Sequence, residues 1–140
     1  MSMSSTSTNA VDPKIVFQRL ERFYSDMRAG DLDAAMTLYD PDAQVIRPAQ
    51  PVIKGVVDIR RWWEETLKDY EFRVSPRLVE ATDVGAVVLQ GQAVGSLVSR
   101  ASGACVDVDS WFVQIYRRQA TGEYLFWRGA SGPNPKRSED

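Results

Sequence analysis

The sequence predicts an α+β fold in which helices come first and a curved antiparallel sheet follows. Apolar residues recur at helical spacing in the first half of the chain, and they alternate with polar residues in the second half. Glycines and prolines separate these segments. We expect the sheet to wrap around about three N-terminal helices as a cone with an internal pocket, because side chains do not fill the ends of such a cone.

Three helices are predicted: from Pro13 to about Gly30, over 32–39 and over 57–67. The first begins at an Asp12 N-cap that is followed by proline, the residue favoured at the first helical position. Asp31 caps the second helix, which we expect to end before Pro41. Paired tryptophans lie in the third helix.

Five strands are predicted, over 43–47, 71–81, 86–98, 105–117 and 124–130. Gly91 and Gly95 interrupt the third of these strands, which indicates a strongly bent or bulged strand. In the fourth strand the even-numbered residues, Phe112 and Gln114 among them, are expected to face the interior.

The strand over 105–117 is apolar on both faces. Trp111, Val113 and Ile115 form a row opposite the face that carries Phe112. A strand that is apolar on both sides is buried on both sides. We therefore expect a homodimer packed sheet against sheet.

Composition limits the classes of function. The chain has 140 residues and a net charge of -2, which argues against a general nucleic-acid binder. We expect one domain over residues 12–132, with disordered tails at 1–11 and 133–140. Neither a secretory signal nor a membrane-spanning apolar stretch is evident, so a cytoplasmic protein without membrane partners is expected.

Histidine is absent and Cys105 is the only cysteine. Nucleophiles activated by histidine and the usual histidine metal sites are thereby excluded. A single cysteine forms neither an internal disulfide nor a cysteine-based zinc site. We expect no metal and no cofactor, and any proton transfer must use carboxylates, tyrosines, lysines, a thiol, water or backbone.

The segment from Arg22 to Leu67 carries a recognisable pattern. It contains Ala-Gly-Asp-Leu-Asp at 29–33, then Tyr39-x-x-Asp42-Ala43, and then Pro48 and Gly55 before the helix with paired aromatics. The segment resembles the N-terminal half of ketosteroid-isomerase-like and SnoaL-like proteins, members of the cone-shaped superfamily named after nuclear transport factor 2. The resemblance implies the cone fold and a pocket for a small hydrophobic ligand, and it leaves the reaction open.

The isomerase's functional residues do not carry over. Its general-base aspartate corresponds to Arg47, its donating tyrosine to Phe23, and its protonated aspartate falls near Phe112. One supporting tyrosine matches Tyr39, and another is replaced by Trp63. The resemblance therefore implies no steroid isomerase activity, because that reaction needs a carboxylate base facing an acidic donor.

Related activities in the superfamily meet similar obstacles. Dehydratases of the scytalone type and SnoaL-like cyclases rely on histidines, which this chain lacks. The limonene-epoxide-hydrolase type carries an aspartate after a Trp-Arg pair, and here Gly129 follows Trp127 and Arg128. The catalytic residues thus remain unassigned.

The predicted substrate-binding residues are Arg47, Tyr39, Trp63, Phe23, Gln114, Phe112, Trp127 and Tyr24. Arg47 either binds a ligand carboxylate or enolate, or it pairs with a structural acid or lies exposed at the strand end. Tyr39 either donates a hydrogen bond to a ligand oxygen or is a core tyrosine with a backbone partner. Gln114 either contacts a ligand or water, or it faces solvent.

Three carboxylates are weaker candidates for an acid–base role. Asp26 lies one turn beyond Phe23 and either reaches the pocket mouth as a base or is a solvated helix carboxylate. Asp107 and Asp109 are expected on the outer face, and a register slip of one residue would bring them inside.

Three functions remain open at this point. The first is a small enzyme of the isomerase, cyclase or dehydratase type acting on a lipophilic, oxygenated, possibly polycyclic molecule, in which Arg47 and Tyr39 stabilise developing negative charge. The second is a non-catalytic carrier that uses the same pocket. The third is an assembly module in which only the dimer surface matters.

Overall fold

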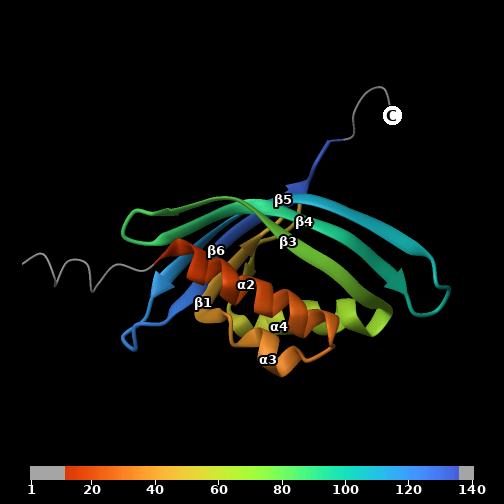
Figure 1. Cartoon of the computed structure of the whole chain (residues 1–140). Helices are drawn as coiled ribbons and strands as arrows, with labels where there is room; N and C mark the ends of the chain where they lie inside the picture. The colour runs from red at the N-terminus through yellow and green to blue at the C-terminus, as the bar shows by residue number, and fades with distance from the viewer. Residues whose placement is uncertain (1–11, 136–140) are drawn as a thin grey trace, which may run out of the picture.

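The computed structural model describes residues 12–135 and confirms the α+β class. Three helices lie on the concave side of one curved sheet (Figure 1). The helices are α2 (Pro13–Arg28), α3 (Leu32–Met36) and α4 (Val56–Asp69). The strands are β1 (Tyr39–Ile46), β2 (Ile53–Lys54), β3 (Tyr70–Asp83), β4 (Val87–Ser99), β5 (Cys105–Arg118) and β6 (Tyr124–Pro133).

The sheet is mixed, whereas an antiparallel sheet was predicted. Its strand order is β2-β1-β6-β5-β4-β3, and every neighbouring pair is antiparallel except β1 and β6, which run parallel. The four strands from β3 to β6 follow one another as hairpins, which makes their pairing antiparallel. β1 and β6 are separated by most of the chain, so no hairpin restricts their relative direction.

The helix caps follow the prediction and one helix boundary does not. The Asp12 carboxylate accepts a hydrogen bond from the Lys14 N–H (2.9 Å), and Asp31 accepts one from the Ala34 N–H (3.2 Å). The second helix nevertheless ends at Met36, so Tyr39 belongs to β1, where it pairs with Phe126. Pairing with β6 outweighs the helical pattern at this point.

The structure describes only a small part of the two predicted tails. The tail expected over 1–11 lies outside the described residues. The tail expected over 133–140 overlaps ordered structure, because Pro133 is the last residue of β6 and the Asn134 side chain donates to the Asp109 carboxylate (2.8 Å).

No helix within residues 12–135 has the length and apolar character needed to cross a lipid bilayer.

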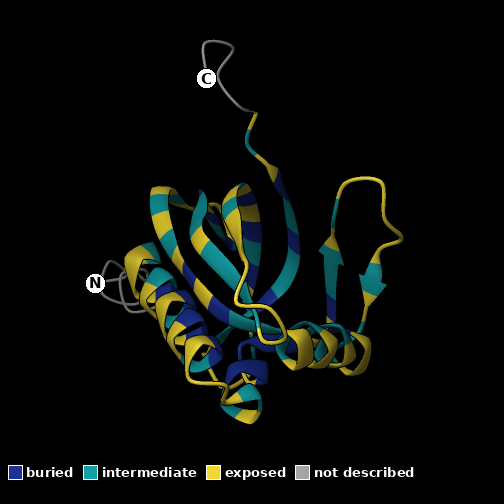
Figure 2. Ribbon diagram, turned by 90° about the vertical axis from the view of Figure 1, so that its right-hand side faces the viewer, coloured by how far each residue is buried: buried dark blue, intermediate teal, exposed yellow. Residues whose placement is uncertain are grey.

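Two irregularities lie side by side in β3 and β4, where strands can bend. Gly91 in β4 has no room for a side chain: a Cβ there would lie 2.3 Å from the Arg77 carbonyl and 2.7 Å from the Phe112 ring. A bulge in β3 falls beside it, between Leu78 and Glu80. The curl brings buried residues of both layers together inside the cone (Figure 2).

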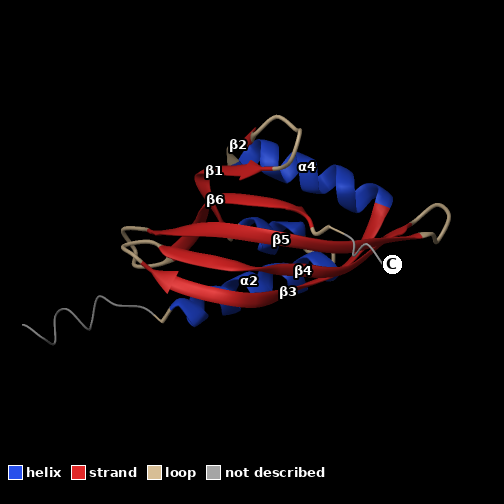
Figure 3. Ribbon diagram, turned by 90° about the horizontal axis from the view of Figure 1, so that it is seen from above, coloured by secondary structure: helices blue, strands red, loops and turns tan. Residues whose placement is uncertain are grey.

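Seen from above, the helices lie behind the sheet, with α4 near the β1–β2 edge and α2 beneath β3 and β4 (Figure 3). The predicted register of β5 is confirmed: Phe112, Gln114 and Tyr116 are buried on the inner face. Trp111 and Val113 lie on the outer face and remain exposed in the single chain. The interior of the cone is thus bounded by α2, α4 and the inner sides of the strands.

Candidate functional site

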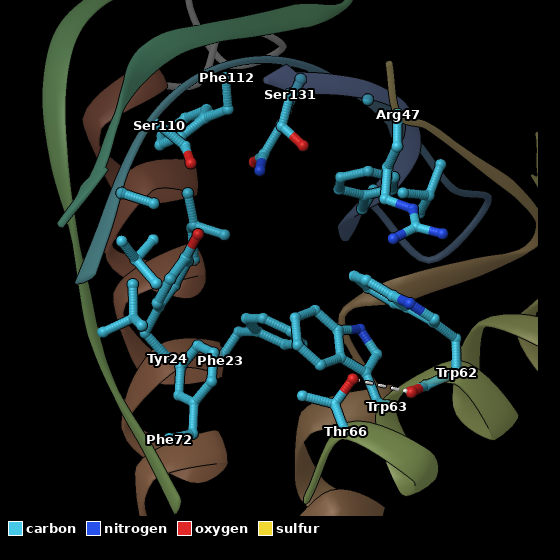
Figure 4. A pocket seen from close by; sticks show the side chains of 18 of the residues that line it. Phe23, Tyr24, Arg47, Trp62, Trp63, Thr66, Phe72, Ser110, Phe112 and Ser131 are labelled. Carbon is cyan, nitrogen blue, oxygen red and sulfur yellow. Dashed lines mark hydrogen bonds between the residues drawn. The ribbon is translucent and has the colours of Figure 1, made fainter. Parts of the chain in front are cut away.

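A cavity of about 400 Å³ occupies the interior between α2, α4 and the sheet. This volume lies within the range of roughly 300–1,000 Å³ that is common for small-molecule sites. Figure 4 shows side chains from both helices and from the strands converging on the space. Aromatic residues dominate its lining: Phe23, Tyr24, Tyr39, Trp62, Trp63, Tyr70, Phe72, Trp111, Phe112 and Phe126.

Phe23 is the centre of the aromatic packing. Its ring centroid lies 5.5 Å from that of Tyr24, 5.7 Å from that of Tyr39 and 5.8 Å from that of Trp63, all in edge-to-face arrangements. Such arrangements are the preferred geometry for aromatic pairs. The wall around Phe23 is therefore closely packed in favourable aromatic contacts.

Tyr39 presents a hydrogen-bond donor to this cavity. Its hydroxyl oxygen accepts a hydrogen bond from the Trp63 indole N–H (3.1 Å), and no acceptor for its own O–H lies among the described residues. Burial raises the pKa of Tyr39 well above its usual value, although the bond from Trp63 opposes that shift. Tyr39 therefore stays protonated and can donate to a ligand oxygen.

A second group of polar atoms lies on the other walls of the cavity. The Tyr24 hydroxyl and the Ser110 and Ser131 hydroxyls point into the open space (Figure 4). Burial raises the pKa of Tyr24 as well. The Gln114 carbonyl accepts a bond from the Tyr116 hydroxyl (2.7 Å), which leaves the Gln114 amide N–H groups for the cavity.

Arg47 is the cation of the cavity. It directly follows β1, and Pro48 after it favours an extended backbone at Arg47. Its guanidinium carbon lies 4.6 Å from the centroid of the Trp62 ring, and Figure 4 shows the guanidinium above that ring. The Arg47 Nε is buried and has no hydrogen-bond partner among the described residues.

Trp127, one of the predicted binding residues, does not line the cavity. The guanidinium groups of Arg128 and Arg117 lie over its ring, at 4.1 and 5.0 Å from the ring centroid. A register shift explains the difference: Tyr116 pairs with Phe126 whereas Ile115 pairs with Arg128, so Trp127 is the extra residue of a bulge. The other seven predicted residues all line the cavity.

No carboxylate lines the cavity among residues 12–135. Asp26, weighed as a base, is absent from the lining, and one of its oxygens is buried without a hydrogen-bond partner. Asp107 and Asp109 are exposed on the outer face, as predicted. Within the described part of the chain, no three His, Cys, Asp or Glu side chains come together as metal ligands.

Sequence reasoning missed Trp62, Ser110 and Ser131. Ser110 could have been found, because it shares its inward parity with Phe112 on β5. Ser131 could not, since the bulge at Trp127 reverses the parity of the residues that follow. Trp62 is adjacent to Trp63 on α4, and the helical pattern alone does not show that both rings reach the cavity.

Comparison with known proteins supports this architecture. The family model for the SnoaL-like domain matches residues 20–124. A search of curated proteins finds no match.

Several solved structures share the fold at low sequence identity. A ketosteroid isomerase-like protein from Erwinia carotovora atroseptica is 14% identical with a TM-score of 0.77, and the alignment covers 89% of this chain and 97% of that one. A candidate aromatic ring hydroxylase from Novosphingobium aromaticivorans is 16% identical (TM-score 0.73; 89% and 90% covered). A candidate dehydratase of the NTF2-like family from Streptomyces avermitilis is also 16% identical (TM-score 0.64; 81% and 89% covered).

Proposed function

Because the chain belongs to the SnoaL-like domain family, we propose that it binds a lipophilic, oxygenated small molecule and acts on it as an isomerase-, cyclase- or dehydratase-type enzyme. One observation carries this proposal. Within residues 12–135, the ionisable residues that line the aromatic cavity are three tyrosines and an arginine, Tyr24, Tyr39, Tyr70 and Arg47, and none is a carboxylate. Such a lining supplies hydrogen-bond donors and positive charge rather than a base.

Reactions of these types develop negative charge on a substrate oxygen. Tyr39 is suited to stabilise that charge, since its O–H is free and its oxygen already accepts from Trp63. Donors held in an apolar, water-poor site act more strongly than they do in water. The proton removed from substrate carbon would pass to water or to a basic group of the substrate itself.

The test is α-proton exchange of a ketone in deuterated water. We expect the protein to accelerate deuterium uptake at the α-carbon of 1-tetralone, measured by mass spectrometry, because stabilisation of the enolate lowers the barrier to exchange. The Tyr39→Phe variant should lose about 10- to 100-fold of the acceleration, in line with the loss of one oxyanion donor. Tyr124→Phe, which removes a hydroxyl outside the cavity lining, is the matched control.

A carrier function is the second candidate, favoured by the absence of a carboxylate from the cavity lining within residues 12–135. The same experiment separates the two functions. A ketone that binds by calorimetry but exchanges no faster than in buffer identifies a carrier. Failure of polycyclic ketones and acids alike to bind would contradict both functions and leave an assembly role.

We also propose that the chain forms a homodimer through the outer face of the sheet. Trp111 and Val113 are 40% and 38% exposed on β5, next to the uncharged Gln90 and Gln92 of β4. Exposed apolar side chains on a continuous sheet face favour burial against a second copy. Trp111→Arg and Val113→Lys should each give monomers by light scattering, and two unchanged masses would refute the dimer.

A further inference from the structure

Arg47 is a charged residue with no acid to neutralise it. Within residues 12–135, no Asp or Glu oxygen comes within 4.0 Å of its guanidinium, whereas Arg60, Arg61, Arg73 and Arg117 each have such a partner. An arginine cannot shed its charge in a protein, so burial without a counter-ion carries a cost. The unpaired charge in an apolar cavity therefore calls for an anion from outside the chain.

The Arg47 side chain donates no hydrogen bond within residues 12–135, and its Nε–H and one Nη–H lie along one edge of the guanidinium. Trp62 covers a face of the group at 4.6 Å. The Nε is buried and has no hydrogen-bond partner in the described part of the chain. Bulk water therefore does not accept a hydrogen bond from it, as it would from the Nε of a surface arginine. An Nε–H and an adjacent Nη–H together match the two oxygens of a carboxylate.

The surroundings of Arg47 define the rest of the ligand. The other lining groups are aromatic and aliphatic, with neutral hydroxyl and amide donors on the walls beyond. In Figure 4 the Tyr24 hydroxyl lies across the cavity from Arg47. A molecule that fills this space carries its charge at one end only.

Building on the proposed small-molecule function, we infer that the ligand is a lipophilic carboxylate whose carboxylate group accepts hydrogen bonds from Nε and one Nη of Arg47. The apolar rings of such a ligand lie against Phe23 and Trp63. Arg47 is then a specificity-determining residue that recognises a permanent charge, while Tyr39 acts on the reacting oxygen.

The test compares an acid with its neutral amide. The probes are 2-naphthoate and 2-naphthamide, with anthracene-2-carboxylate and its amide as a larger pair, and binding is measured by calorimetry. We expect the unmodified protein to prefer each carboxylate by at least about tenfold, because charge-assisted hydrogen bonds are about twice as strong as neutral ones. Arg47→Met should reduce that preference to less than about twofold while the affinity for the amide stays nearly the same.

Two control variants exclude trivial explanations. Arg128→Met removes another guanidinium that stacks on a tryptophan, at 4.1 Å from Trp127, but outside the cavity lining, and it should keep the full preference. Arg47→Lys keeps the charge without the paired donors and should keep only part of the preference. Circular dichroism confirms that each variant is folded.

The outcomes separate this inference from the proposed function. Equal binding of acid and amide by the unmodified protein overturns the inference and leaves small-molecule binding intact. A preference that survives in Arg47→Met overturns it as well, because another group then recognises the charge. Binding of none of the four probes overturns the inference and the proposed function together.

Discussion

Arg47 and Arg117 are two of the three arginines that stack on tryptophans within residues 12–135, and they differ in what else they contact. Arg47 lies 4.6 Å from the Trp62 ring inside the cavity, and Arg117 lies 5.0 Å from the Trp127 ring outside it. Arg117 also donates to the Asp40 carboxylate at 2.9 Å, while Arg47 has no such partner among the described residues. The difference shows that stacking alone does not identify a structural arginine. Arg128 has no acid partner either, but it donates to the carbonyls of Asp42 and Trp127. Within the described residues, Arg47 is distinguished from the other two by having no side-chain hydrogen-bond partner at all.

Asp40, the acid that pairs with Arg117, is buried and hydrogen-bonded. Asp40 is 2% exposed, and its carboxylate accepts hydrogen bonds from the Asp42 N–H, Arg117 and Gln119. Burial alone would raise the pKa of Asp40, but these hydrogen bonds and the charge of Arg117 together lower it below its usual value. Arg117 thus compensates a buried charge, whereas Arg47 brings an uncompensated one.

The largest expected effect comes from removing each arginine in turn. Arg117→Met should lower the free energy of unfolding by about 2 kcal/mol, because it leaves the buried Asp40 carboxylate without its cation; the 44% exposure of Arg117 keeps this below the value for a fully buried pair. Arg47→Met should lower the free energy of unfolding by at most about 1 kcal/mol, since it loses the stacking on Trp62 and leaves no partner unpaired. Urea unfolding measures both.

Equal losses of unfolding free energy in Arg47→Met and Arg117→Met would contradict the distinction between a paired and an unpaired arginine. They would mean that Arg47 stabilises the fold through contacts beyond its stacking on Trp62. A larger loss in Arg47→Met than in Arg117→Met would reverse the comparison altogether.

Acid sensitivity provides a second, smaller test. A carboxylate whose pKa is lowered by folding stabilises the protein above the unfolded pKa of about 3.9, and that contribution is lost as the pH falls through the folded pKa. The stability advantage of the unmodified protein over Asp40→Asn should therefore be greatest near neutral pH and shrink below about pH 4. Urea unfolding at a series of pH values measures it.

Asp33→Asn is the control for the acid series. Asp33 pairs with Arg60 but is 86% exposed, so its removal should change stability little at any of these pH values. An Asp40→Asn difference that stays constant down to pH 2 would refute the ionic role of Asp40.

The residues that line the cavity around Arg47 could largely be predicted from the sequence. Alternation within β5 correctly placed Phe112, Gln114 and Tyr116 on the inner face. Arg47, which corresponds to the general base of the isomerase, was predicted to bind substrate, and it lines the cavity. The placement within β5 depends on short-range periodicity, which the backbone geometry of a strand enforces. The placement of Arg47 depends on the family resemblance.

The ion pair between Asp40 and Arg117 and the position of Trp127 depend on long-range contacts, which a single sequence does not reveal. Asp40 and Arg117 are 77 positions apart, so their ion pair follows from strand order and register alone. Trp127 leaves the cavity because of a bulge that alternation gives no sign of. The absence of an acid near Arg47 was equally hidden, since it depends on where all the carboxylates of the chain fold.

The smallest effect concerns the stacking itself. Double-mutant cycles with Arg47→Met and Trp62→Leu, and with Arg117→Met and Trp127→Leu, should each give a coupling energy of about 0.5–1 kcal/mol in urea unfolding. Similar values are expected because the two guanidinium groups lie at similar distances, 4.6 and 5.0 Å, from their rings. A coupling above about 2 kcal/mol for Arg47 and Trp62 alone would indicate that the ring satisfies the cation by itself. The acid would then no longer be what separates the two arginines, and the case for a carboxylate ligand would weaken with it.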